Sequence, residues 1–299
     1  MNKHFKEFAA DFSLFLVAFV WGATFLIVKD AIDKTPVYTF LFWRFLIATI
    51  LMTLFSMRYL KNIDKHSIFA GFVLGVFLFL GFALQTFALE FTYSSTVGFI
   101  TGLNIIIVPF AMFFIFKTKV SIFSVFGILM ASIGLYFLAV NNNINLGKGE
   151  FYTLICAVMF ALQIVFTGYF VKKCNIYVLV VFQFMTVTIL CFFGMIVMNN
   201  EFLPKKIDQT FINAIIITAV FATVFAFFIQ TAMQRFTSAV KTAIIFSTEP
   251  VIAGIIGYYF ANELLTNLQI FGAVLIIGGM LTAEVGSYFY ARKKLKNRS

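Results

Sequence analysis

The chain has 299 residues, of which 62% are hydrophobic and only 11% charged, and phenylalanine alone occurs 44 times. With a mean hydropathy of +1.01, this composition excludes a soluble globular domain of the same length. The formal net charge of +10 does not indicate nucleic-acid binding, because basic residues in the loops of a membrane protein report its orientation.

The apolar segments are long enough to cross a membrane as helices. Each runs for about 20 residues, which spans a hydrocarbon core at about 1.5 Å per residue. Continuous runs such as FLVAFVWGATFLIV, residues 15–28, argue against a β-barrel, whose strands alternate apolar and polar residues. We therefore predict an all-α integral membrane protein. In chain order, its ten predicted spans cover residues 8–28, 36–57, 68–89, 94–116, 121–140, 150–171, 176–198, 211–234, 238–260 and 266–289.

Basic residues are distributed unequally between the two sets of loops. If the N-terminus is cytoplasmic, 16 of the 22 Lys and Arg residues lie in inside segments and five in outside segments, with Arg44 within the second span. This bias, together with an even number of spans, predicts that both termini are cytoplasmic. The basic C-terminal tail ARKKLKNR, residues 291–298, is then expected to meet anionic lipid headgroups.

The second half of the chain repeats the first. QTFALEFT, residues 85–92, matches QTAMQRFT, residues 230–237, at an offset of 145, and the same offset places Asn104 on Glu249. Earlier in each half the offset is 139, which places Arg44 on Gln183. We therefore divide the chain into two repeats, residues 1–142 and 143–299. Each contains five spans, and because five is odd the second repeat enters the membrane from the opposite side.

Inverted repeats predict a fold and a place for the site. Transporters with this arrangement bind substrate near the membrane midplane, between the two repeats. The predicted fold is therefore ten transmembrane helices, arranged as two inverted five-helix repeats around a central cavity.

Several segments carry a family resemblance. They are FVWGATF at 19–25, FWRFLIA at 42–48, TYSSTVGFITGLNIIIVP at 92–109 and TSAVKTAIIFSTEPVIAGIIGYYFANE at 237–263. With these segments the chain resembles the drug/metabolite transporter superfamily, of the ten-helix type with two EamA-like repeats. The resemblance implies a basket of helices that moves small organic molecules through a central cavity open alternately to each face. One departure is Phe160, which stands where the first repeat has Trp21-Gly22.

The dipeptide Glu249-Pro250 lies deep in the ninth predicted span. A carboxylate in hydrocarbon is costly unless it is paired, and such groups usually face a pathway. Two interpretations stay open: Glu249 binds substrate or a proton in the cavity, or it is a structural carboxylate hydrogen-bonded at a kink that Pro250 introduces.

Arg44 is the second charged residue predicted deep in a span. Because guanidinium does not lose its proton in proteins, Arg44 needs a partner. That partner is a carboxylate, helix-end carbonyls or an anionic substrate, and an ion pair with Glu249 is one hypothesis. A structural clamp and binding of a substrate carboxylate are both compatible with the sequence.

Uncharged amides and one tryptophan complete the candidate site. Amides within membrane spans either hold helices together or line a wet site, and as a group they suit a zwitterionic or neutral polar metabolite. Trp21, in the middle of the first span, is the aromatic candidate. The predicted substrate-binding residues are Trp21, Arg44, Gln85, Asn104, Gln163, Gln183, Gln230 and Glu249.

The predicted function is secondary transport of an amino acid or related metabolite, with export as the expected direction, across the cytoplasmic (inner) membrane of a bacterium. Proton-coupled efflux of drugs or toxic compounds is an alternative, with Glu249 as the proton carrier. Transport of a cation or metal is a weaker one. We expect no enzyme activity and no cofactor, because the chain has no Walker A pattern, HExxH or CxxC. The expected partners are the small-molecule substrate, the lipid bilayer and, if transport is proton-coupled, protons, but no nucleic acid.

Overall fold

The protein is described here by a computed structural model, which covers residues 3–60, 63–92, 94–118, 120–139, 147–204, 207–260 and 266–296. Within these ranges the secondary structure is helical, with no strand. The predicted boundary between the repeats, at 142/143, lies outside the described residues, as do the last two residues of the basic tail, 297 and 298.

The helices of the two halves follow one another in the same order. The first half contains α1 (Lys3–Ile32), α2 (Val37–Ser56), α3 (Lys65–Phe91), α4 (Ser94–Thr101), α5 (Asn104–Phe116) and α6 (Ile122–Ala139). The second half contains α7 (Lys148–Phe170), α8 (Ile176–Val197), α9 (Gln209–Ala219), the π-helical turn η1 (Val220–Phe225), α10 (Ala226–Met233), α11 (Ala239–Phe246), α12 (Glu249–Phe260) and α13 (Asn267–Lys296).

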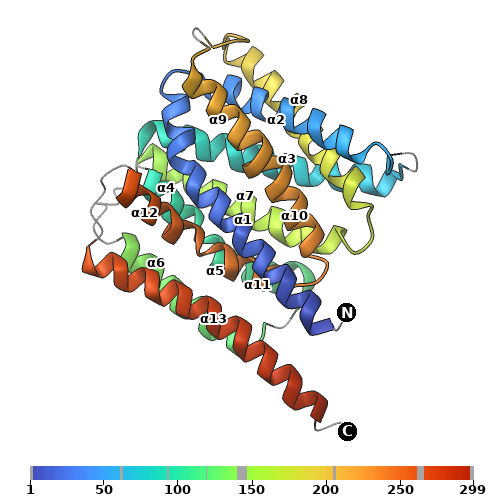
Figure 1. Cartoon of the computed structure of the whole chain (residues 1–299), viewed down its shortest axis with the longest axis vertical. Helices are drawn as coiled ribbons and strands as arrows, with labels where there is room; N and C mark the ends of the chain where they lie inside the picture. Colours follow the sequence, from blue (N-terminus) through green and yellow to red (C-terminus); the bar gives the residue numbers. More distant parts are fainter. Residues whose placement is uncertain are drawn as a thin grey trace.

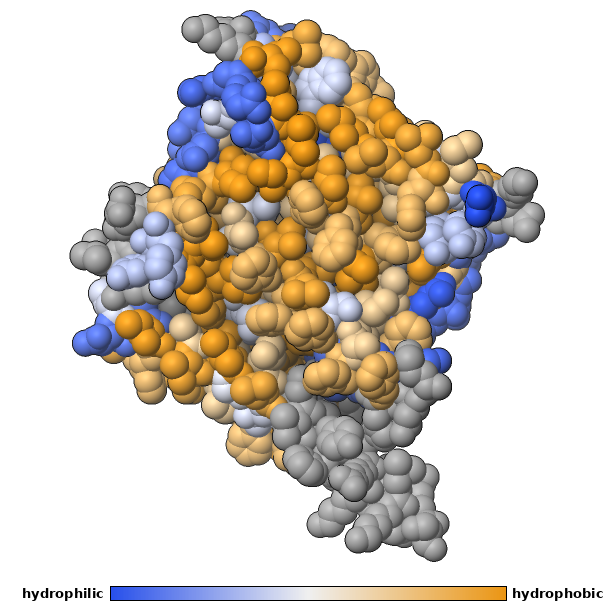
Figure 2. Space-filling model, viewed as in Figure 1, coloured by the Kyte–Doolittle hydropathy of each residue, from blue (hydrophilic) through white to orange (hydrophobic). Residues whose placement is uncertain are grey.

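These elements confirm the predicted membrane fold. Eight helical segments are long and apolar enough to cross a bilayer, and two shorter apolar helices cover residues 122–137 and 267–283. The ten segments match the ten predicted spans in order. On the face drawn in Figure 2, hydrophobic residues form a broad band, and hydrophilic residues gather at its left and right edges. A bilayer whose hydrocarbon covers this band leaves both polar edges in water.

Two spans are broken at equivalent positions of the two halves. The fourth span stops at the end of α4 and restarts with Asn104, the first residue of α5. The ninth stops at the end of α11 and restarts with Glu249, the first residue of α12. The interruption expected at the Glu249-Pro250 pair thus lies at residues 247 and 248, just before it. Pro250 lies in the first turn of a new helix, where its missing N–H leaves no bond unmade.

The α6–α13 pair forms one side of the bundle, opposite the side formed by α2 and α8 (Figure 1). A Cβ added at Gly127 would lie 2.7 Å from the carbonyl oxygen of Gly279, and one added at Gly134 would lie 2.5 Å from that of Gly272. The offset of 145 pairs Gly127 with Gly272 and Gly134 with Gly279. Gly127 thus packs on the repeat equivalent of Gly134, and Gly134 packs on the repeat equivalent of Gly127. A two-fold relation between the halves requires this exchange.

Close packing also joins the halves between α3 and α8. A Cβ at Gly71 would lie 2.7 Å from the Leu179 carbonyl, and one at Gly75 would lie 2.7 Å from the Gln183 carbonyl. The small residues let the two backbones approach. Gly98 differs, because an added Cβ would meet only the Phe25 ring, at 3.9 Å.

A polar cap fixes the start of α3 on the face that carries the termini. The Asp64 carboxylate accepts hydrogen bonds from the Ser67 amide at 2.7 Å and the Ser67 hydroxyl at 2.6 Å. These two bonds hold the pKa of the Asp64 carboxyl below its usual value. The Ser67 hydroxyl oxygen in turn accepts from the backbone N–H of Asn175 at 2.9 Å, which ties α3 to the start of α8.

Replacing Gly134 tests the contact between the halves. In Gly134→Ala the new methyl group collides with backbone, which cannot rotate away, so we expect a loss of about 1–3 kcal/mol. We expect the melting temperature of the purified protein in detergent to fall. Gly98→Ala is the matched control and should be neutral or slightly stabilising, because the methyl group has room and alanine favours the helix. Equal melting temperatures for the two variants would contradict the close contact of α6 with α13.

Candidate functional site

A cavity lies among the broken helices, between the two halves. The empty space between its walls, counted together with space that is open to solvent, is about 670 Å3. Aromatic rings supply much of its wall, and amides, hydroxyls and two charged groups supply the rest. The lining residues are Trp21, Thr24, Phe25, Val28, Arg44, Phe82, Gln85, Thr86, Thr101, Asn104, Phe160, Gln163, Ile164, Phe227, Gln230, Phe246 and Glu249.

Seven of the eight residues singled out from the sequence line this cavity. The exception is Gln183, which is fully buried on α8 and lies outside the lining. That the seven bind substrate stays a prediction. Sequence reasoning missed the apolar wall, although the internal repeat carried a signal for it, because Phe82 and Phe227 are equivalent under the offset of 145 and both line the cavity.

Arg44 projects from α2 and is held by the η1 turn. Its Nε donates to the Thr223 hydroxyl at 2.9 Å, and its Nη2 donates to the Ala222 carbonyl at 3.5 Å. The guanidinium carbon also lies 4.4 Å from the centroid of the Phe82 ring, a cation–π contact. Arg44 is 3% exposed, so these contacts replace most of its hydration.

The η1 turn leaves the backbone carbonyl of Ala222 available as a hydrogen-bond acceptor for side chains. The N–H of Ala226 donates to Phe221, five residues back, and does not reach the Ala222 carbonyl four residues back. The Trp21 indole N–H donates to this same Ala222 carbonyl at 2.9 Å. Because π-helical turns leave backbone groups open in this way, they are frequent at functional sites. Here one carbonyl positions both Trp21 and Arg44.

Glu249 stands at the second helix break. The Ser247 and Thr248 hydroxyls donate back to the carbonyls of Ile244 and Ile245, at 2.6 and 2.7 Å, and so satisfy the end of α11. A Cβ at Gly22 would lie 2.7 Å from the Glu249 carbonyl oxygen. Only glycine at this position therefore lets α1 touch the break.

The ion pair between Arg44 and Glu249 that the sequence suggested is not formed. Ion pairs among the described residues join Lys34 to Asp208, and Lys241 to Glu7 and Asp11. The reason is that backbone and hydroxyl oxygens already hold the Arg44 guanidinium. Both charged groups therefore line the cavity without being paired to each other.

The amides retain hydrogen-bonding capacity. Gln230 Nε2 donates to Gln163 Oε1 at 3.0 Å, and Gln85 Nε2 donates to the Thr101 hydroxyl at 3.3 Å. Within the described part of the chain, Asn104 Oδ1, Gln163 Nε2 and Gln230 Oε1 are buried and have no hydrogen-bond partner. These atoms can bind a polar ligand in the cavity.

The helix breaks add fixed dipoles to the cavity. The N-terminal ends of α5 and α12, at Asn104 and Glu249, both lie at its wall. Helix N-termini carry partial positive charge and favour anionic groups. In transporters with broken helices, such ends point at the anionic part of the substrate.

The fold and the cavity define a class of protein, namely a multi-pass membrane transporter of two inverted five-helix repeats. The model of the EamA-like transporter family matches the chain twice, over residues 8–140 and 147–283. The chain therefore belongs to the EamA-like transporter family.

Related proteins agree with this membership. An uncharacterized transporter of Archaeoglobus fulgidus is 33% identical over 272 residues, which cover 91% of this chain and 84% of that protein. The uncharacterized transporter YoaV of Bacillus subtilis is 22% identical over 290 residues, covering 93% and 97% of the two chains. A protein of known crystal structure has a TM-score of 0.76 at 14% identity, over 92% of this chain and 95% of that one. This last likeness supports the fold alone.

Substitutions of Trp21 test its hydrogen bond separately from its packing. Trp21→Phe removes the indole N–H but keeps a ring against Phe227 and Phe246, so we expect a loss of about 1 kcal/mol in stability. Trp21→Ala also removes the ring and should cost about 3–5 kcal/mol. Thermal unfolding in detergent measures the stability of both variants, with the fraction of monodisperse protein that remains after heating as the readout. If Trp21→Phe is as damaging as Trp21→Ala, the ring packing contributes little and this description of the wall is wrong.

Proposed function

We propose that this protein is a secondary transporter for a small zwitterionic metabolite, an amino acid or a closely related compound. The observation that carries this proposal is the presence of Arg44 and Glu249 on one cavity without an ion pair between them. A zwitterion supplies a partner of opposite charge to each. An occupied cavity is then neutralised at both positions, which offsets the cost of keeping charged groups out of water.

The two charged groups define how such a substrate binds. Its carboxylate is directed to Arg44 and to the positive N-terminal end of α5, and its ammonium group is directed to Glu249. The amides of Asn104 and Gln163 provide further hydrogen bonds, and aromatic rings accommodate an apolar side chain. The proposed transport cycle exposes this cavity alternately to the two faces of the membrane by rocking the two repeats.

The orientation and direction of transport belong to the same proposal. We place the protein in the cytoplasmic (inner) membrane of a bacterium, and the positive charge of the loops supports an orientation with both termini in the cytoplasm. We propose export as the physiological direction. A proton carried on Glu249 would couple export to the proton gradient.

Two other substrate classes are favoured less. Aromatic walls such as Phe82 and Phe227 also suit amphipathic drugs, so proton-coupled efflux of toxic compounds is the second candidate. A bare cation or metal ion fits worse, because the fixed charge of Arg44 repels it and Glu249 is the one carboxylate in the lining.

Counterflow in proteoliposomes tests the proposed function. Vesicles are loaded with unlabelled amino acids, nucleobases, sugars and cationic dyes in separate pools, and uptake of labelled members of each pool is followed. We expect exchange of one class of amino acid by the wild type, and a loss on the order of tenfold or more in Arg44→Gln, because a buried charged partner is lost. Lys34→Gln, at an exposed surface pair, is the matched control and should retain exchange.

The variant Glu249→Gln separates substrate binding from proton coupling. If Glu249 carries the proton, this variant exchanges substrate but no longer responds to an imposed pH gradient. If Glu249 only binds the ammonium group, exchange itself is lost at every pH. Exchange of dyes in place of amino acids favours the second candidate, and no exchange from any pool contradicts the proposal.

A further inference from the structure

The two halves of the chain line the cavity unequally. Under the offsets of 139 and 145, seven pairs of equivalent residues have both members in the lining, Gln85 and Gln230 among them. Three further residues, Val28, Arg44 and Thr86, line the cavity, but their equivalents in the second half do not. By their positions along α1, α2 and α3, these three lie toward the face of the bundle opposite the chain termini.

The three missing equivalents are Thr167, Gln183 and Thr231, on α7, α8 and α10. Each is 0% exposed. The hydroxyls of Thr167 and Thr231, and both polar atoms of the Gln183 amide, have no hydrogen-bond partner among the described residues. Buried polar groups in folded proteins are paired in most cases, so a layer of three unpaired ones needs a physical explanation.

Hydrogen bonds close the bundle next to this layer. Gln230 on α10 bonds Gln163 on α7 at 3.0 Å. At the C-terminal cap of α10, Gln234 Nε2 donates to the Ile164 carbonyl at 3.1 Å. These bonds join α7 and α10 on the side of the cavity that faces the termini.

On the opposite side, the equivalent pair of described residues does not form this closure. The equivalents of Gln163 and Gln230 are Thr24 and Gln85, which do not bond each other. Thr24 donates to the Trp21 carbonyl at 2.9 Å, and Gln85 donates to Thr101. The cavity therefore extends between α1 and α3 but stops between α7 and α10.

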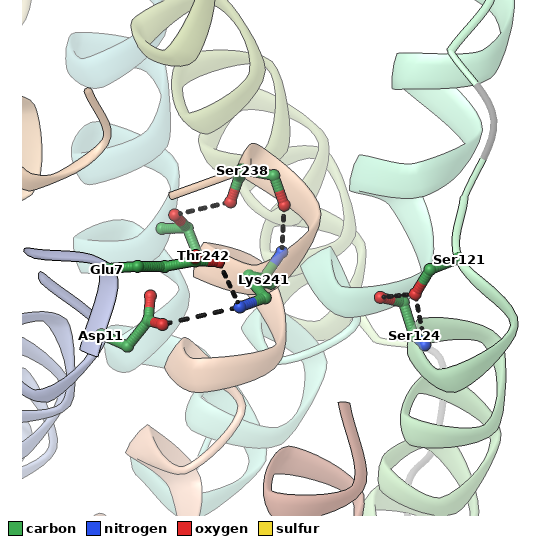
Figure 3. A network of polar contacts seen from close by, with 7 residues as sticks. All are labelled: Glu7, Asp11, Ser121, Ser124, Ser238, Lys241 and Thr242. Atoms are coloured by element: carbon green, nitrogen blue, oxygen red, sulfur yellow. Dashed lines mark hydrogen bonds and ion pairs between the residues drawn. The ribbon is translucent and has the colours of Figure 1, made fainter. Parts of the chain in front are cut away.

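An ion-pair cluster closes the same end further out (Figure 3). Lys241 Nζ, at the start of α11, lies 2.8 Å from Glu7 Oε1 and 3.6 Å from Asp11 Oδ2, both on α1. The side chains of Lys241 and Asp11 are 11% and 7% exposed. At the opposite face, the residue equivalent to Lys241 is the uncharged Thr96.

We propose that Thr167, Gln183 and Thr231 line the part of the permeation path that is closed in this structure. When the cavity opens toward the termini, Gln183 takes the place of Arg44 beside the substrate. The proposal rests on the alternating access stated under the proposed function. In that opening the bonds between α7 and α10 break, the three polar side chains gain water or substrate as partners, and Val28, Arg44 and Thr86 become the closed layer.

Accessibility of single cysteines tests this proposal without a known substrate. The three native cysteines, Cys156, Cys174 and Cys191, are free and buried and are replaced by serine. Cysteine is then introduced singly in the variants Thr167→Cys, Gln183→Cys and Thr231→Cys, and at the equivalent positions as Val28→Cys and Thr86→Cys. Right-side-out and inverted membrane vesicles are treated with a charged, membrane-impermeant thiol reagent. Labelling after denaturation in detergent gives the total reactive thiol.

The expected result is opposite sidedness. Val28→Cys and Thr86→Cys should react from one face, and Thr167→Cys, Gln183→Cys and Thr231→Cys from the other, with rates that differ between faces on the order of tenfold. The two threonine positions keep the test valid if Gln183→Cys fails to fold. Absence of reaction at all three positions from either face, or reaction from the same face as their equivalents, would overturn the proposal.

A substitution in the ion-pair cluster should shift the equilibrium between the two orientations of the cavity. Lys241→Met removes the ion pairs that close the termini side, so labelling of Thr167→Cys should become several-fold faster. Lys34→Met breaks the exposed pair with Asp208 and should leave the rate unchanged, because exposed pairs contribute little. Unchanged labelling in Lys241→Met would contradict the role of the cluster in closure. Opposite sidedness without exchange of any amino acid would reject the proposed substrate but leave this inference standing.

Discussion

The structure depends on how polar backbone is satisfied inside a membrane. Hydrocarbon offers no hydrogen bonds, so non-helical backbone at membrane depth is tolerated only where it is buried in protein or lines a polar cavity. The chain interrupts two of its spans, after Thr101 and after Phe246. Hydroxyls of Ser247 and Thr248 satisfy carbonyls at the second interruption. Short-range backbone hydrogen bonds, such as those from the Gly102 N–H to the Gly98 carbonyl and from the Ile252 N–H to the Thr248 carbonyl, satisfy further groups of both breaks. The residues that restart the helices, Asn104 and Glu249, line the cavity.

The same constraint explains why charged groups are stable there. A π-helical turn in the eighth span presents the Ala222 carbonyl to both Trp21 and Arg44. Arg44 is thus held without a carboxylate, and Glu249, at the start of α12, stays available to a ligand. Had the two formed an ion pair, neither would be available to a ligand. We propose that their separation favours a zwitterionic substrate over a cation or an uncharged drug.

Most of the fold could be predicted from the sequence because membrane helices depend on local composition. Long apolar runs give the ten spans, and collinear matches such as Gln85 with Gln230 give the inverted repeat. Seven residues that line the cavity can be picked out from the sequence because a polar or indole side chain inside an apolar run is conspicuous. The partners of Arg44 could not be predicted, because they are a hydroxyl and a backbone carbonyl of a π-helical turn, and VFATVF at 220–225 has no composition that marks such a turn. The sequence does not distinguish a kink from the helix restart at Glu249, because proline is compatible with both.

The central claim is that the cavity binds a molecule through a carboxylate and an ammonium group together. Trp21 lines the cavity, and because the chain has two tryptophans, Trp43→Phe leaves Trp21 as the single fluorescent reporter. We would titrate this variant with the amino acid found by counterflow, with its carboxamide, and with the analogue that lacks the amino group. The account predicts saturable fluorescence changes for the amino acid and affinities lower on the order of tenfold or more for both analogues. Equal affinity for all three would contradict it.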